Sequence, residues 1–332
     1  MGMTERSLRR LRLRHIELLD SFHANSTVRA VAEKLHLSQP AISKMVREIE
    51  ETCGMALFVR SRRGMQPTAQ GLILIRQAGH MIQHLRAAAE QFKALEAGAS
   101  GLLRVGSSSM TYELQPAIVE LQRDFPGLLV RIRQARPRQL VADLLAGDLD
   151  CAVTSLPPDC LAQPEATQLT LETIAKDHLC VVASSRHPLA TKKALDWRDL
   201  MGERWAVSEL DGLTRQQLIS VYLQRGLELP TPSVESVNHK TILEVVSLDP
   251  GMLGVLRWNQ ARKDSALYGL KVLPLRPRVP LPEISFIVPK YAAAEPAVVE
   301  RLRAALLRHR LRAGRAGQPA SGSKARARRS SE

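Results

Sequence analysis

Residues 26–51, STVRAVAEKLHLSQPAISKMVREIEE, decide how the N-terminal part of the chain folds. In the first half of this stretch, apolar residues recur three and four positions apart, which predicts a short helix with one buried face. These residues are Val28, Val31, Ala32 and Leu35. Ser26 or Thr27 can cap this helix, and His36-Leu37 is typical of a turn after it. The stretch therefore begins with a helix and a turn.

A second helix is predicted to follow at once. Ser38 can cap it, and Pro40 falls in its first turn, where a missing backbone N–H does no harm. One face is apolar, with Ile42, Val46 and Ile49 spaced to meet a core. The opposite face carries side chains that can pair with base edges and phosphates, namely Gln39, Ser43, Lys44 and Arg47. Within this window alone, an ordinary amphipathic helix with a solvated polar face is the alternative.

The next segment is typical of a wing. The apolar run Met55–Val59 is followed by Arg60-Ser61-Arg62-Arg63-Gly64, which predicts a hairpin with a basic tip placed to meet phosphates or a minor groove. Helix, turn, polar-faced helix and hairpin occur in the order of a winged helix-turn-helix. Residues 1–66 are therefore predicted to form a DNA-binding domain, in preference to a merely solvated amphipathic helix.

A long helix is predicted over residues 67–97, opened by Pro67-Thr68. Its apolar residues recur at helical spacing as one stripe, made of Leu72, Ile75, Ile82, Leu85, Ala89, Phe92 and Leu95. Because a single helix cannot bury such a stripe on itself, we expect it to pair with the same helix of a second copy of the chain. Packing against its own chain is the alternative.

The motifs above together resemble those of LysR-type transcriptional regulators. The resemblance rests on residues 35–50 with Gln39-Pro40-Ala41-Ile42-Ser43 at their centre, on Gly54, Leu57-Phe58 and Arg60, and on Arg62-Arg63-Gly64 and Pro67-Thr68-Ala69-Gln70-Gly71. Two positions depart slightly, because Val31 and Cys53 stand where the family usually has alanine and leucine. Carried over by position, the resemblance implies that Gln39, Pro40, Ser43, Lys44 and Arg47 meet the major groove. It likewise implies that Arg60, Arg62 and Arg63 serve the wing.

Charge and composition agree with a nucleic-acid partner. The net charge is +14, of which residues 1–66 carry +5 and residues 301–332 carry +9, while the stretch between them is neutral. Positive charge confined to two ends suits a polyanion, because neutralising phosphates releases counterions. No run of about 18 apolar residues predicts a membrane span, and no secretory signal is recognisable. The four cysteines lack metal-ligand spacing, so we expect reduced core thiols in a cytoplasmic protein without metal or cofactor.

After the flexible break at residues 98–101, short apolar runs alternate with helical patterns, which indicates a parallel α/β sheet. The expected effector domain spans residues 101–305, with two lobes joined by crossings near residues 170–178 and 268–275. The resemblance implies that this domain is periplasmic-binding-protein-like and holds its ligand between the lobes. From about Ala313 the composition is basic and poor in apolar residues, so residues 313–332 are predicted to be a disordered tail.

Polar residues at expected strand ends are the candidate effector contacts. Ser107, Ser108 and Ser109 follow a strand and precede a helix, where hydroxyls and free backbone N–H groups favour an anion, most simply a carboxylate; a plain helix cap is the alternative. The other candidates are Thr154, Ser208, Asn238 and His239, and a lone histidine such as His239 is more often structural. A serine-hydrolase elbow is a poor match, because Met110 and Thr111 stand where glycine is required.

The predicted function is a sequence-specific transcriptional regulator, not an enzyme, whose DNA binding is modulated by a small organic acid. The predicted partners are an imperfect inverted repeat in double-stranded DNA, a second copy of the chain in a homodimer or homotetramer, and, from the resemblance, RNA polymerase. Two alternatives stay open from the sequence. One is a nucleoid-type protein that binds DNA without sequence preference. The other is a thiol-based redox sensor using Cys151 and Cys160.

Overall fold

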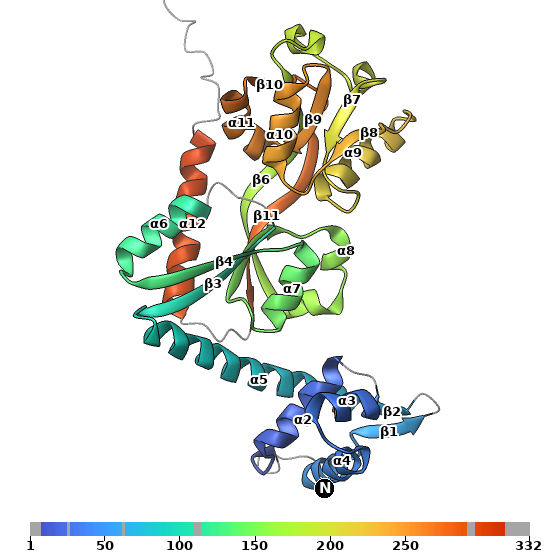
Figure 1. Cartoon of the computed structure of the whole chain (residues 1–332), viewed down its shortest axis with the longest axis vertical. Coiled ribbons are helices and arrows are strands. Elements are labelled where there is room, and N and C mark those ends of the chain that lie inside the picture. Colours follow the sequence, from blue (N-terminus) through green and yellow to red (C-terminus); the bar gives the residue numbers. More distant parts are fainter. Residues whose placement is uncertain (1–7, 25–26, 62–63, 109–113, 291–295, 316–332) are drawn as a thin grey trace, which may run out of the picture.

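The computed structural model describes residues 8–24, 27–61, 64–108, 114–290 and 296–315. A small N-terminal head sits at one end of the long helix α5 (Ala69–Glu96), and the other end of α5 meets a larger α/β region (Figure 1). The head contains α2 (Leu13–Ala24), α3 (Val28–Leu35), α4 (Gln39–Cys53), β1 (Phe58–Ser61) and β2 (Gly64–Pro67). The predicted winged helix-turn-helix is confirmed.

Local signals in the sequence set the two central helices of the head. The Thr27 hydroxyl caps α3 by accepting a hydrogen bond from the Ala30 amide at 3.3 Å, and the Ser38 hydroxyl caps α4 in the same way from the Ala41 amide at 3.3 Å. Between them His36 has a left-handed φ of 54°, which ends α3 and lets α4 begin three residues later. Both helices therefore start and stop where side-chain caps and a turn dictate.

One hydrophobic core joins the head to the first part of α5. The buried faces of α2, α3 and α4 meet the wing strands there, and the rings of Phe22 and Phe58 lie 4.7 Å apart. From α5 this core takes Leu74, Ile75 and Ala78. Burying an aliphatic side chain of this size stabilises the fold by about 1.5–3 kcal/mol. The beginning of α5 thus belongs to the head.

The apolar stripe predicted on α5 is divided between two environments. Ile75 is buried and Ile82 half-buried against the head, so part of the stripe packs on its own chain. The stripe residues Leu72, Leu85, Phe92 and Leu95 are instead at least half exposed, and so are Ile73 and Met81 elsewhere on the helix. Packing on its own chain therefore accounts for part of the stripe, and pairing with a second copy of the chain stays a prediction for the exposed part.

A mixed sheet, with nine strands among the described residues, forms the larger region. Its order is β4-β3-β5-β11-β6-β9-β7-β8, and β10 also pairs with β6. The strands are β3 (Gly101–Ser107), β4 (Leu128–Gln134), β5 (Cys151–Ser155), β6 (Leu169–Ser184), β7 (Arg204–Val207), β8 (Pro232–Glu235), β9 (Met252–Arg257), β10 (Leu270–Val272) and β11 (Val279–Pro289). The predicted parallel sheet holds within each lobe, but the sheet as a whole is mixed, because the long strands β6 and β11 run antiparallel to each other and to their neighbours β9 and β5.

Two lobes share this sheet through β6 and β11, which cross from one lobe to the other (Figure 1). Lobe I, nearer α5, has β3, β4 and β5 parallel and lobe II has β7, β8 and β9 parallel. The helices that cover lobe I are α6 (Leu114–Asp124), α7 (Pro137–Leu145), α8 (Pro158–Leu161) and α12 (Pro296–Arg315). Those that cover lobe II are α9 (Leu213–Gln224), α10 (His239–Leu248) and α11 (Trp258–Asp264). Short 3-10 helices lie at residues 164–168, 188–191, 197–200 and 265–268.

Two expected boundaries differ from the structure. The second crossing was predicted near residues 268–275 but is made by β11, because that stretch folds as a 3-10 turn and the short strand β10 at the edge of lobe II. The basic tail was predicted from Ala313, yet α12 continues to Arg315; residues 316–332 lie outside the described residues. No helix in the described part of the chain is both long and apolar enough to cross a bilayer.

Candidate DNA-reading helix and interlobe site

The polar face of α4 is presented to solvent. Gln39, Lys44 and Arg47 are exposed and Ser43 is half-buried, while Pro40 occupies the first turn. The opposite face, with Ile42, Val46 and Ile49, is fully buried in the head core. Within the described residues these polar side chains make no hydrogen bond or ion pair, so their donors and acceptors are available. The structure therefore brings the five α4 residues predicted to contact DNA onto one short helix.

Glu50 ties the end of α4 to the wing. Its Oε1 accepts hydrogen bonds from the backbone amides of Leu57 at 2.8 Å and Phe58 at 3.0 Å. The strands β1 and β2 then pair in register from Phe58 with Pro67 to Ser61 with Gly64. Arg60 lies in β1, and the predicted tip residues Arg62 and Arg63 lie outside the described residues. The wing strands are thus oriented relative to α4 by one carboxylate.

Three hydroxyls predicted to face the effector come together in lobe I. Ser107 ends β3 and Ser108 follows it, and the Thr154 hydroxyl on β5 donates to the Ser108 Oγ at 2.5 Å. The hydroxyl of Ser155, which the sequence did not single out, is buried and has no hydrogen-bond partner among the described residues. Ser109 lies outside those residues. The carboxyl ends of β3 and β5 therefore gather hydroxyls at one edge of the sheet.

In lobe II the predicted residues divide into two places. The Ser208 hydroxyl, directly after β7, lies 2.8 Å from the Thr214 hydroxyl at the start of α9. Asn238 caps α10 by accepting from the Lys240 amide at 3.0 Å. The His239 ring turns to α11, with its Nε2 3.2 Å from the Asp264 carboxylate. Burial lowers the pKa of His239 even though Asp264 opposes the shift. His239 thus contacts the core of lobe II.

Arg215 follows Thr214 in α9 and is buried. The sequence did not predict a buried cation here. Its Nε and Nη1 are buried and have no hydrogen-bond partner in the part of the chain that the structure describes. A buried guanidinium without a partner is costly, and an anion bound to it would offset that cost. The one signal in the sequence for this residue is its place in the first turn of a predicted helix that follows Ser208.

Ion pairs connect the carboxyl ends of the strands in the two lobes. Arg136 follows β4 of lobe I, and its guanidinium contacts the carboxylates of Glu209 and Asp211, which lie between β7 and α9 of lobe II. The edge that carries Ser107 and the edge that carries Ser208 are therefore neighbours. We call the residues at these two edges the interlobe site. Sequence reasoning missed this contact, because nothing in the pattern pairs Arg136 with an acidic turn 73 residues later.

The cysteines are buried and reduced. Burial raises the pKa of the Cys151 and Cys180 thiols, and the neighbouring Asp150 and Asp177 raise them further. Burial also raises the thiol pKa of Cys160 and of Cys53. Because the thiolate is the reactive form, these environments disfavour oxidation. Among the described residues, no group of three or more His, Cys, Asp or Glu side chains is placed to hold a metal ion.

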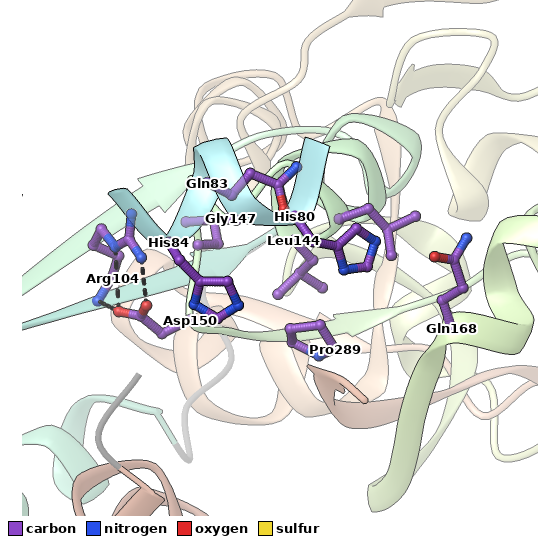
Figure 2. A pocket seen from close by; sticks show the side chains of 11 residues that line it. His80, Gln83, His84, Arg104, Leu144, Gly147, Asp150, Gln168 and Pro289 are labelled. Atoms are coloured by element: carbon purple, nitrogen blue, oxygen red, sulfur yellow. Dashed lines mark hydrogen bonds and ion pairs between the residues drawn. The ribbon is translucent and has the colours of Figure 1, made fainter. Parts of the chain in front are cut away.

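Figure 2 shows a pocket at the junction of α5 and lobe I. Its empty space is about 430 Å³, a figure that includes space open to solvent. The helix contributes His80, Gln83 and His84, whereas lobe I contributes the buried ion pair of Arg104 and Asp150 among others. The pocket thus lies where the helix that carries the head meets the lobe that carries part of the interlobe site.

Two protein-family models match the chain. Residues 13–72 match "Bacterial regulatory helix-turn-helix protein, lysR family", and residues 96–310 match "LysR substrate binding domain". The chain is 30% identical over 241 residues to the HTH-type transcriptional regulator GbpR of Azospirillum brasilense, covering 72% of this chain and 69% of that protein. It is 27% identical to the hydrogen peroxide-inducible genes activator of Dickeya chrysanthemi, over 73% of this chain and 78% of that protein.

Solved structures show the same fold. A full-length OxyR variant from Pseudomonas aeruginosa superposes with a TM-score of 0.55 at 22% identity, over 89% of this chain and 94% of that one. An OxyR variant of Corynebacterium glutamicum gives a TM-score of 0.53 at 21% identity, over 92% and 94% of the two chains. At this identity the likeness concerns the architecture of head, long helix and two lobes.

Proposed function

Because the chain belongs to the LysR family of transcriptional regulators, we propose that it binds an imperfect inverted repeat in DNA as a homo-oligomer, and that a small organic acid between its lobes alters this binding. The family membership itself establishes a DNA-binding head and an effector-binding domain in a regulator, not an enzyme. The inverted repeat, the oligomer and the class of effector are the proposal.

The free polar face of α4 is the observation that carries the DNA-binding part. Gln39, Ser43 and Arg47 lie on the face of α4 opposite the one buried in the head. Their side chains form no hydrogen bonds with other described residues. Amide, hydroxyl and guanidinium groups on an exposed helix suit base edges and phosphates in a major groove. The proposal includes Arg60, which lies in β1, with Arg62 and Arg63 as the basic residues of the wing.

The exposed apolar residues of α5 support a homo-oligomer through this helix. Leu85 and Phe92 are more than half exposed and lie seven residues apart, on the same side of α5. A second copy of α5 packed against this side would remove them from water, which is favourable in proportion to the area buried. Two heads joined in this way would meet two half-sites of an inverted repeat.

Unused polar groups near the lobe boundary support an acidic effector. The Ser155 hydroxyl and the Arg215 guanidinium are buried without partners among the described residues. Ser107, Ser108, Thr154 and Ser208 lie at or next to the carboxyl ends of β3, β5 and β7. A carboxylate can accept from all of these donors. Asn238 and His239 support ligand binding less, because one caps α10 and the other pairs with Asp264. An effector acts by preferring one arrangement of the lobes over another.

The two rival interpretations receive less support. The buried thiols, with pKa values raised by burial, argue against a sensor that uses Cys151 and Cys160, although one similar protein is named a hydrogen peroxide-inducible genes activator. A nonspecific nucleoid-type protein needs only cations, whereas α4 also presents an amide and a hydroxyl. Specific recognition accounts for these better.

The experiment is a binding-site selection at physiological salt with the full-length protein. Q39A or S43A should relax base preference at one or two positions, each lost contact costing about 1–3 kcal/mol. R47Q should weaken binding to all sequences. The matched control is R29Q on α3, where Arg29 is exposed and paired with Glu33; it should leave base preference unchanged. Unaltered preference in Q39A and S43A would count against the proposal.

The oligomer is tested separately by sedimentation. The double variant L85E/F92E should dissociate the protein, because two charges would enter the apolar contact. L267E is the control, since Leu267 is even more exposed than Leu85 and Phe92 but lies in lobe II. A wild-type monomer, or a double variant that sediments like wild type, would remove α5 as the contact.

A further inference from the structure

Arg136 is a cation whose ion pairs bridge the two lobes. It occupies the N-cap position of α7, two residues after the end of β4, so its backbone belongs to lobe I. Separate nitrogens of its guanidinium contact the carboxylates of Glu209 and Asp211, both in the turn between β7 and α9 of lobe II. One arginine therefore holds two acidic side chains that belong to the other lobe.

In each lobe, the residues of this contact lie next to a hydroxyl residue of the interlobe site. In lobe I, the amide of Ala135, the residue before Arg136, donates to the Ser107 carbonyl at 3.3 Å. In lobe II, Glu209 directly follows Ser208. The contact thus lies between the hydroxyl groups that support an effector in each lobe.

The acidic turn is shaped so that both carboxylates reach the arginine. The Gly212 amide donates to the Glu209 carbonyl at 2.8 Å, which closes the turn. A Cβ on Gly212 would lie 2.6 Å from the Ser208 Oγ, so the turn tolerates only glycine there without a shift of that hydroxyl. The turn that carries Glu209 and Asp211 is held next to Ser208 by its own backbone.

A guanidinium is a planar fork of donors that matches a carboxylate, the functional group of an organic acid. Here the chain itself supplies the carboxylates. The side chains of Arg136, Glu209 and Asp211 are 63%, 43% and 51% exposed, so the ion pairs are open to solvent and individually weak. With two carboxylates on one cation, the cluster keeps an excess negative charge and can release one of them. A carboxylate from solution can therefore replace either.

From this geometry we propose that Arg136 is the carboxylate-binding residue of the interlobe site, and that Glu209 and Asp211 are internal competitors which occupy it when no effector is bound. This inference rests on the proposed acidic effector and adds the residue that selects for its charge. Binding of the effector exchanges an interlobe ion pair for a pair with the ligand, so it also loosens one tie between the lobes.

A matched ion pair lies on the same helix. Arg138 of α7 contacts Asp159 of α8, with side chains 64% and 54% exposed. Both partners belong to lobe I, so this pair has the same chemistry and exposure without joining the lobes. R138Q is therefore the control for R136Q.

The test is a calorimetric titration of the full-length protein with acetate, succinate and citrate, at constant ionic strength set with sodium chloride. E209Q/D211N should bind at least one of these acids about 2- to 25-fold more tightly than wild type, because two exposed ion pairs no longer compete. R136Q and the triple variant R136Q/E209Q/D211N should lose this binding, whereas R138Q should match wild type. Equal binding by E209Q/D211N and the triple variant, or no binding by either, overturns the proposal.

Hydrogen exchange gives a second readout that needs no ligand. In R136Q the backbone amides of residues 209–216 should exchange faster than in wild type, and in R138Q they should not. Equal exchange in R136Q and R138Q also overturns the interlobe tie. These outcomes are independent of DNA recognition: the head variants test the regulator, and base preference should be the same in E209Q/D211N and wild type without acid.

Discussion

Gly71 of α5 lies directly against the backbone of Leu57, before the wing: a Cβ on Gly71 would be 2.0 Å from the Leu57 carbonyl oxygen. The same carbonyl accepts a hydrogen bond from the Thr68 amide at 2.8 Å, and the Thr68 hydroxyl caps α5 by accepting from the Gly71 amide at 3.0 Å. The wing and the long helix are therefore joined where only glycine fits.

G71A should destabilise the head and weaken DNA binding. Because the clash is with backbone and not with a flexible side chain, we expect a loss of about 1–3 kcal/mol in the free energy of unfolding. The measurement is denaturant unfolding followed by a DNA-binding assay. G79A is the control within the same helix, since its Cβ would meet only the Asp20 Oδ1 at 3.5 Å. It should be neutral or stabilising by up to about 1 kcal/mol; equal behaviour of the two variants would contradict the packing described.

Asp150 is predicted to be essential to the stability of lobe I. Its carboxylate accepts from the Arg104 Nη2 at 2.6 Å, from the Nε at 3.3 Å and from the Arg104 amide at 2.7 Å, and both residues are buried. D150N leaves a buried guanidinium unpaired and should cost about 3–5 kcal/mol. The exposed Asp148 supplies the control D148N, which should cost less than about 0.5 kcal/mol.

A double replacement separates pairing from packing at the same site. R104M/D150L removes both charges, so it should be more stable than D150N alone. Denaturant unfolding of the three variants is the measurement. If the double variant is less stable than D150N, then Arg104 and Asp150 also stabilise lobe I through contacts other than their own ion pair.

Gly147 presses lobe I against α5 beside the junction pocket. It has a φ of 66°, and a Cβ there would lie 2.8 Å from the Gln83 Cβ. G147A should therefore suffer both backbone strain and a clash with α5, and Q83G/G147A should recover the part due to the clash. G202A is the control for strain alone, because Gly202 has a φ of 78° and nothing within 4 Å. Thermal unfolding is the measurement. If the Tm of G147A is no lower than that of G202A, the close contact of Gly147 with Gln83 is ruled out.

Acid should destabilise the larger region through two histidines. Burial lowers the pKa of His239 and of His178, and near His178 Arg278 and Arg276 act in the same direction. In the unfolded chain both titrate near pH 6.5. The unfolded state thus takes up protons first as pH falls below about 6.5, and the free energy of unfolding should decrease until the folded pKa values are reached. H178Q/H239Q should flatten this dependence between pH 7 and pH 5; an unchanged slope would argue against it.

Peroxide should have no effect on DNA binding. All four thiols are buried with raised pKa values, so little thiolate is available for oxidation. Mass spectrometry of the native protein after peroxide treatment should find no disulfide between Cys151 and Cys160. A peroxide-dependent disulfide together with altered DNA affinity would restore the redox interpretation.

Much of the fold was predictable from local chemistry. Thr27, Ser38 and Thr68 mark helix starts that the structure confirms, and the alternation of apolar runs with helical patterns after Gly101 correctly indicated an α/β region. The antiparallel direction of β6 and β11 was not predicted, because an apolar strand has the same sequence pattern whether its neighbouring strands run parallel or antiparallel to it. Pairing direction is decided by tertiary contacts far along the chain.

The candidate sites were predicted unequally. The polar face of α4 follows from helical periodicity, so the exposed positions of Gln39 and Arg47 could be foreseen. His239 was predicted from its place after a strand, but its ring turns to Asp264, a residue on another element. Arg136 with its two acidic partners, and the unpaired Arg215, depend on contacts between elements. The periodicity of apolar residues in the sequence does not predict such contacts between elements.

Sequence-specific recognition of DNA is best tested by selecting genomic fragments with the purified full-length protein at physiological salt and footprinting the best fragment. We expect a protected inverted repeat whose half-sites lie about one helical turn of DNA or a multiple of it apart, bound on one face, and we expect Q39A/R47Q to lose this protection. Affinity that depends on salt but is indifferent to sequence, and that Q39A/R47Q reduces equally for all fragments, would contradict it.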